Sequence, residues 1–172
     1  DGLGDRAELF FETHGYLADL GYEGYEVSNF ARSRPDRSRH NLAAWAHRPY
    51  LGLGPGAHSF IDGDHGPIRR WNLPDLGGWL DAVEAGSTPP RGEERPSKDQ
   101  QILEHIMLGV RTRDGVDLAV CRRQLGELRT AALLERAAGP LERGLLILSD
   151  DRLRPTLDGM ALADRLAVDL SG

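Results

Sequence analysis

The chain has 172 residues, 40% of them hydrophobic, and a formal net charge of −6 at pH 7. This length accommodates one core with a small appended module, and the acidic balance argues against a nonspecific nucleic-acid surface, which needs a basic excess. No apolar run approaches the roughly 20 residues that cross a bilayer, and no signal-peptide pattern opens the chain, so we expect no membrane span. Cys121 is the one cysteine, which excludes an intrachain disulfide and favours a reducing, cytoplasmic setting.

The first half of the chain has the helix-then-strand rhythm of an α/β protein. Side chains at helical spacing predict a first helix that ends at Gly21: Leu9, Phe10, Thr13, Tyr16, Leu17 and Leu20. Alternation over 22–28 predicts a strand, and a polar, arginine-rich loop follows. Beyond the loop we expect a helical turn over 41–46, a strand over 50–53, a hairpin and a helix over 75–85.

A composition break predicts where one domain ends and the next begins. The stretch 86–96 holds three of the ten prolines and no large hydrophobic residue. We therefore expect an α/β part over 1–86, a linker over 87–96 and a mainly helical part over 97–172.

The helical part is expected to contain three helices, a hairpin over 145–155 and a last helix, an order that resembles a winged-helix module. Ser97 with Gln100 forms a capping box at its start, and Asp117 is a natural cap for the second helix. It contains 11 basic and 12 acidic residues, so we expect a packing or docking module and not a DNA reader.

Three residues in one short stretch could meet a flat ligand: His40, Asn41 and Trp45. A neutral imidazole can ligate a transition metal or heme iron, and its second nitrogen needs a partner, which Asn41 could supply. Trp45 could stack on a macrocycle. The alternative is a structural loop in which all three serve packing and turn formation. The four histidines of 40–65 have no tight metal-ligand spacing, so a structural zinc site is disfavoured.

A glycine-rich turn and the end of the predicted strand over 22–28 are further candidates. Gly52, Gly54 and Gly56 do not form a dinucleotide fingerprint, but they permit a close backbone approach beside Ser59. Ser28 and Asn29 follow that strand, and in barrels such positions line the pocket. The alternatives are a strand-end bend and ordinary loop polarity.

Three ordered motifs together resemble the coproporphyrinogen III oxidase-like radical S-adenosylmethionine (SAM) family. They are Gly-Tyr-x-x-Tyr-Glu-Val-Ser-Asn-Phe-Ala over 21–31, Arg-His-Asn-x-x-x-Trp over 39–45, and Tyr-Leu-Gly-x-Gly-Pro-Gly-Ala-x-Ser over 50–59. The resemblance implies the C-terminal elements of a partial triose-phosphate-isomerase-type barrel, followed by a helical module. It also implies a 4Fe–4S cluster and S-adenosylmethionine, held in the family by a three-cysteine loop.

This chain has no such loop, so it is a fragment or has lost the cluster-bearing half, and should be inactive alone. The residues of the first and third motifs favour the heme chaperone branch. In that branch a His-Asn-x-x-Tyr-Trp motif is associated with heme. Here Ala44 stands at the tyrosine position. The implied ligand is heme or a porphyrin, with His40 as metal ligand and heme-acceptor proteins as partners. The alternatives are the oxygen-independent coproporphyrinogen III oxidase and a noncatalytic interaction module.

Overall fold

The computed structural model describes residues 2–172, with side chains from residue 7 onward, as two compact units of mixed α/β structure. Unit 1 combines the residues up to Leu42 with residues 102–172, and unit 2 consists of residues 43–101. Helices α2 and α4 each cross from one unit to the other. No helix in the described part of the chain is both long and apolar enough to cross a membrane.

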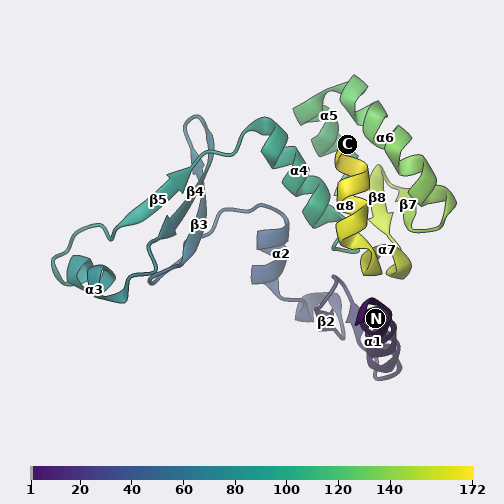
Figure 1. Cartoon of the computed structure of the whole chain (residues 1–172), viewed down its shortest axis with the longest axis horizontal. Helices are drawn as coiled ribbons and strands as arrows, with labels where there is room; N and C mark the ends of the chain where they lie inside the picture. Colours follow the sequence, from purple (N-terminus) through teal and green to yellow (C-terminus); the bar gives the residue numbers. More distant parts are fainter. Residues whose placement is uncertain (1) are drawn as a thin grey trace. The chain divides into compact units, whose positions relative to one another are not determined.

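The elements follow one another along the chain as Figure 1 labels them. The α-helices are α1 (Gly2–Asp19), α2 (Arg39–Trp45), α3 (Leu76–Glu84), α4 (Lys98–Gly109), α5 (Leu118–Leu125), α6 (Glu127–Glu142), α7 (Leu157–Ala161) and α8 (Ala163–Ser171), and a 3-10 helix covers Arg34–Asp36. The strands are β1 (Glu23–Gly24), β2 (Phe30–Ala31), β3 (His58–Gly63), β4 (Gly66–Asn72), β5 (Arg91–Glu94), β6 (Val116–Asp117), β7 (Leu146–Ser149) and β8 (Arg152–Pro155).

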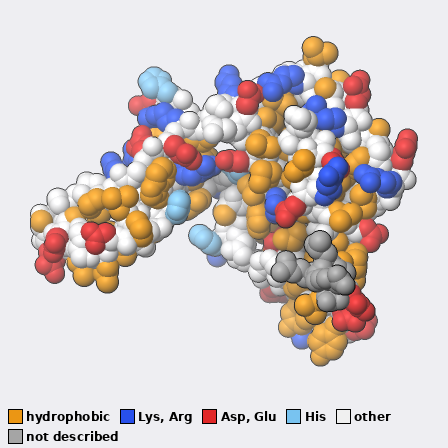
Figure 2. All heavy atoms as spheres, viewed as in Figure 1, with side chains coloured by type: hydrophobic (Ala, Val, Ile, Leu, Met, Phe, Trp, Pro, Cys, Tyr) orange, Lys and Arg blue, Asp and Glu red, His pale blue; other side chains and the backbone are white. Residues whose placement is uncertain are grey.

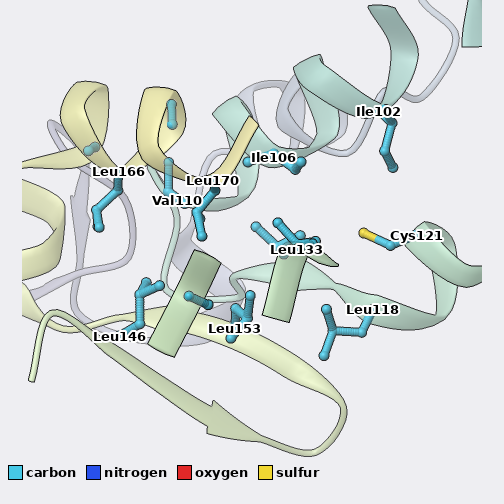
Figure 3. Close-up of a cluster of buried hydrophobic side chains, with 14 residues drawn as sticks. Ile102, Ile106, Val110, Leu118, Cys121, Leu133, Leu146, Leu153, Leu166 and Leu170 are labelled. Carbon is cyan, nitrogen blue, oxygen red and sulfur yellow. The ribbon is translucent and has the colours of Figure 1, made fainter. Parts of the chain in front are cut away.

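The main hydrophobic core lies in the C-terminal part of unit 1. Buried side chains from α4, α5, α6 and α8 converge with those of the antiparallel sheet β6-β8-β7 (Figure 3). The helices reach this core because their apolar residues recur at helical spacing, as with Leu133 and Ala137 on α6 and Leu166 and Leu170 on α8. Leu133, Leu153 and Leu170 are fully buried, so this core is well enclosed.

The segment before α2 is joined to the C-terminal helices by backbone hydrogen bonds. Val27 N–H donates to the Arg111 carbonyl at 3.0 Å, and Arg113 N–H donates to the Tyr25 carbonyl at 3.1 Å. Between them Glu26 and Thr112 form an antiparallel bridge. The short pair β1 and β2 is also antiparallel. This arrangement seats residues 23–31 on the stretch that follows α4.

Unit 2 consists of the antiparallel sheet β3-β4-β5 and the helix α3. Cross-strand ion pairs tie β4 to β5, with Arg70 Nε 2.7 Å from Glu93 Oε2. The Trp71 ring covers Gly92 on the neighbouring strand so closely that any side chain at that position would overlap it. Hydrophobic side chains lie at the surface over α3 (Figure 2), including Leu76, Leu80 and Val83.

Several predicted elements are confirmed, because their signals are local. The capping box at the start of α4 forms, with Ser97 N–H donating to Gln100 Oε1 at 2.7 Å and Gln100 N–H donating to Ser97 Oγ at 3.2 Å. Asp117 caps α5 as expected. Gly21 adopts a φ of 80° directly after α1, in agreement with its predicted role as a helix stop.

Other predictions were wrong. The strand over 22–28 reduces to two residues of β1 and a bridge at Glu26, and Tyr50 forms only a bridge to Phe60. Every strand pairing among the described residues is antiparallel, so the parallel pairing expected of a barrel is not present there. The expected linker contains β5, since its residues 91–94 pair with β4. The last helix is two helices, interrupted at Leu162.

Candidate ligand-binding site

The start of α2 is held in place by unit 1. Ser38 N–H donates to the Tyr25 hydroxyl at 3.1 Å, and Tyr25 is itself buried. The Ser38 hydroxyl in turn accepts a hydrogen bond from Asn41 N–H at 3.3 Å, which satisfies one of the N–H groups that a helix start leaves without a partner. His40 is exposed in this first turn and Asn41 is half-buried. The predicted His-Asn pair therefore lies on an anchored helix start.

The third predicted residue, Trp45, lies on a different face of the same helix. Each residue of an α-helix advances about 100°, so His40 and Trp45 point about 140° apart around α2. Ala44, four residues after His40, shares the face of His40. The structure therefore places His40 and Asn41 in the same helical turn but does not place Trp45 over the His40 ring, and the position four residues after His40 carries only a methyl group.

The glycine-rich turn is packed against the chain itself. The Gly52 N–H donates to the Ser59 hydroxyl at 3.0 Å, and a Cβ at Gly52 would overlap the His58 backbone. Gly54 has a φ of 104°, and its carbonyl accepts a hydrogen bond from the Asn72 side chain at 2.8 Å. Gly56 also adopts a positive φ, of 70°. At Gly52 the backbone therefore comes very close to β3, whereas a Cβ at Gly54 would meet nothing within 4 Å.

Ser28 and Asn29 shape a tight turn. The N–H and hydroxyl of Ser28 both donate to Glu26 Oε1, at 3.0 and 3.2 Å. The Asn29 carbonyl accepts from Tyr25 N–H at 3.2 Å. Ser28 is exposed and Asn29 is half-buried, so their polar groups have local partners at the surface.

Sequence reasoning missed a buried polar cluster beneath this turn. Glu26 is fully buried, and its second carboxylate oxygen has no hydrogen-bond partner among the described residues. His14 is also buried, with Nε2 unpartnered, and its ring packs between Phe10 and Phe30. Burial lowers the pKa of His14, a hydrogen bond with the Val27 backbone partly offsets this, and the nearby Arg113 lowers the pKa further, which favours the neutral imidazole. The alternating pattern around Glu26 gave no sign of this burial, because alternation does not say which face is covered.

The side chains present do not fit an iron–sulfur cluster. Cys121 is fully buried in α5, and burial, with the nearby Asp117, raises the pKa of its thiol to about 11. Cluster ligation requires several exposed or preorganised thiolates. Among the described residues, no group of three or more His, Cys, Asp or Glu side chains is arranged to hold a metal ion.

Comparison with known proteins gives a consistent assignment. Residues 97–162 match the family model of the HemN C-terminal domain. The heme chaperone HemW of Mycobacterium tuberculosis is 36% identical over 172 residues, which cover all of this chain and 40% of that protein. The mouse protein named radical S-adenosyl methionine domain-containing protein 1, mitochondrial, is 32% identical over 175 residues, covering 95% of this chain and 38% of that protein. The solved structure of coproporphyrinogen III oxidase from Escherichia coli, described as a radical SAM enzyme, has a TM-score of 0.64 at 20% identity over 93% of this chain and 39% of that one.

These similarities, together with the three motifs and the shared fold, show that the chain belongs to the coproporphyrinogen III oxidase-like radical SAM family. It spans about 40% of the length of the curated relatives it matches. Within the family, the relatives named heme chaperone, from Mycobacterium tuberculosis and, at 28% identity, from Bacillus subtilis, support the chaperone branch.

Proposed function

We propose that this chain is the part of a heme chaperone that contacts the tetrapyrrole, with His40 as an axial ligand of the iron and Asn41 beside it. The observation that carries this proposal is the anchored start of α2, where Tyr25 and Ser38 hold the backbone on either side of the exposed His40. The names of the relatives support heme as the cargo. Proteins that accept the heme are the partners this function requires, and the free thiol of Cys121 suits a reducing, cytoplasmic compartment.

The roles within this proposal follow from the faces of α2. A neutral imidazole binds iron, so in this proposal His40 supplies the metal contact. Asn41, which projects about 100° away around the helix, contacts a propionate. Trp45 lies on another face and contributes an apolar contact without stacking over the ring that His40 holds. Ala44 places only a methyl group where the related motif has a tyrosine, so we expect the affinity to depend mainly on the axial bond.

We also propose that residues 1–86 correspond to the C-terminal end of the radical SAM barrel and 97–172 to a winged-helix-like module. The fold likeness to the Escherichia coli oxidase and the family match over 97–162 support this division. A barrel needs parallel partners, which in this proposal come from the rest of a longer protein. The 4Fe–4S cluster and S-adenosylmethionine belong to that longer protein.

The experiment that tests heme binding is a hemin titration of the wild type and two variants. His40→Ala should remove the Soret shift and weaken binding about tenfold or more, because 1.4 kcal/mol of lost axial bonding already equals a factor of ten. His65→Ala is the matched control, since His65 is exposed in the β3–β4 turn and outside the motif. Equal spectra and equal affinities for all three proteins would make His40 a structural residue and end the heme assignment.

A second candidate function is the oxygen-independent oxidase. The fold likeness to coproporphyrinogen III oxidase favours it, whereas the relatives named heme chaperone favour the first proposal. The two differ in one measurable respect, because a chaperone binds heme without decarboxylating coproporphyrinogen. A third candidate, a noncatalytic interaction module, would bind neither tetrapyrrole.

A further inference from the structure

An arginine-rich loop leads into α2 and differs in charge from the rest of the chain. Residues 32–42 contain four arginines and one aspartate, although the whole protein has a net charge of −6. Arg32, Arg34 and Arg39 are exposed. The loop and the first turn of α2 both belong to unit 1.

Most arginines elsewhere in the described chain have a carboxylate partner. Pairs of this kind include Arg70–Glu93, Arg122–Asp151, Arg152–Asp117, Arg111–Asp164 and Arg165–Asp169. In contrast, Arg34 and Arg39 form no ion pair with any described residue. The one acid of the loop, Asp36, accepts a hydrogen bond from the Ser33 hydroxyl at 2.6 Å. The loop therefore presents positive charge that no carboxylate of the described residues neutralises.

The fourth arginine of the loop, Arg37, has a structural role. Arg37 is largely buried, its Nη2 lies 3.1 Å from Glu23 Oε2, and its guanidinium lies over the Tyr25 ring. Arg32 also has a fixed place, with its guanidinium 4.7 Å from the centre of the Tyr22 ring. These contacts, and the bond from Ser38 to Tyr25, hold the loop in one shape while Arg34 and Arg39 face solvent.

We propose that Arg32, Arg34 and Arg39 form a carboxylate-binding loop that recognises the propionate side chains of a tetrapyrrole. This inference rests on the proposed function, because it assigns the loop to the same ligand as His40. A guanidinium is a planar fork that matches a carboxylate with two parallel hydrogen bonds, and a preorganised fork loses little freedom on binding. Arg39 directly precedes His40, so a ring ligated by His40 has this loop beside it. The site therefore selects tetrapyrroles by their acidic side chains as well as by their metal.

The test uses metal-free coproporphyrin III, which carries four propionates and needs no axial ligand, and its tetramethyl ester. Binding is followed by porphyrin fluorescence for the wild type and for Arg34→Gln/Arg39→Gln. The double variant should bind the free acid about tenfold more weakly, as expected for lost hydrogen bonds to a charged group, and should bind the ester as the wild type does. Arg32 is left intact because its substitution would also disturb Tyr22.

The matched control is Arg91→Gln/Arg123→Gln, which removes two exposed arginines of equal charge from β5 and α5. It should leave the affinity for the free acid unchanged, and circular dichroism should show that both double variants are folded. Arg34→Lys/Arg39→Lys should recover only part of the affinity, because lysine restores the charge but not the fork.

Three results would overturn the inference. The first is that the wild type does not bind coproporphyrin III, and the second is that Arg34→Gln/Arg39→Gln weakens binding of the free acid and the ester equally. The third is that this double variant weakens only the binding of a short DNA duplex, tested as a second polyanion, and leaves porphyrin binding unchanged. The result is separable from the heme test. His40→Ala should retain its affinity for the metal-free porphyrin. The role of the arginines is therefore measured by coproporphyrin III fluorescence, and the role of His40 by the hemin titration.

Discussion

Two glycines of unit 1 occupy helices but have very different surroundings. Gly159, in the first turn of α7, lies so close to the Leu145 carbonyl that a Cβ would overlap it, whereas Gly15 in α1 has nothing within 4 Å of a Cβ. Both have ordinary helical φ values. The difference between them is therefore one of packing and not of backbone conformation.

We predict that Gly159→Ala lowers the free energy of unfolding by about 1–3 kcal/mol, because the added methyl group must displace backbone. Gly15→Ala is the control and should raise helix stability by up to about 1 kcal/mol, since alanine is the better helix former. Urea denaturation followed by circular dichroism measures both. A neutral Gly159→Ala would show that α7 moves away from Leu145 without cost.

Cys121 provides a prediction about chemical reactivity and pH. Its thiol is fully buried with a pKa raised to about 11, against an ordinary value of 9.0. Because the native state holds the proton more tightly, this contribution to stability is fully present below pH 9 and is lost as the pH rises through 11. We expect no reaction with a thiol reagent at pH 8 in the folded protein and full reaction in urea. Rapid labelling without denaturant would contradict the burial.

At the scale of elements, Asp117 connects a helix to a hairpin. Its Oδ1 accepts from Ala119 N–H at 2.9 Å and Val120 N–H at 3.2 Å, while its Oδ2 lies 2.6 Å from Arg152 Nη2 on β8. One carboxylate thus caps α5 and pairs with the strand next to β6.

We predict that Asp117→Ala costs about 1–2 kcal/mol of stability, mainly through the lost cap. Asp117→Asn should cost less, because its side-chain oxygen can still cap the helix and only the ion pair to Arg152 is lost. Denaturant midpoints of the two variants decide the point. Equal losses would mean that the ion pair, and not the cap, carries the effect.

Elements defined by local chemistry could be predicted from the sequence, and those defined by distant pairing could not. The capping residues of α4 and α5 and the glycine after α1 identify themselves through their neighbours in the chain. The pairing of 25–27 with 111–113 has no such signal, because neither stretch indicates its partner. The same limit applies to the candidate site: the motif singles out His40 and Asn41 as candidates, whereas the burial of Glu26 depends on what covers it.

At the scale of the whole molecule, the single cysteine gives a prediction about radical chemistry. Its one thiol is enclosed and protonated, so it cannot contribute to a cluster. We predict that the chain, supplied with iron and sulfide under anaerobic conditions, does not cleave S-adenosylmethionine. The measurement is 5′-deoxyadenosine by liquid chromatography, with Cys121→Ser as the control. Product above the buffer level, and lost in Cys121→Ser, would contradict the prediction.

The backbone pairing between residues 25–27 and 111–113 also couples sequence changes in these two stretches. The first stretch carries Tyr25, whose hydroxyl fixes the start of α2, and the second belongs to the helical module. An insertion that shifts the register of either stretch must be compensated in the other, although they are far apart in the gene. A helical module that replaced this one would therefore have to supply a stretch that pairs with residues 25–27, because those residues carry the Tyr25 hydroxyl that anchors the start of α2.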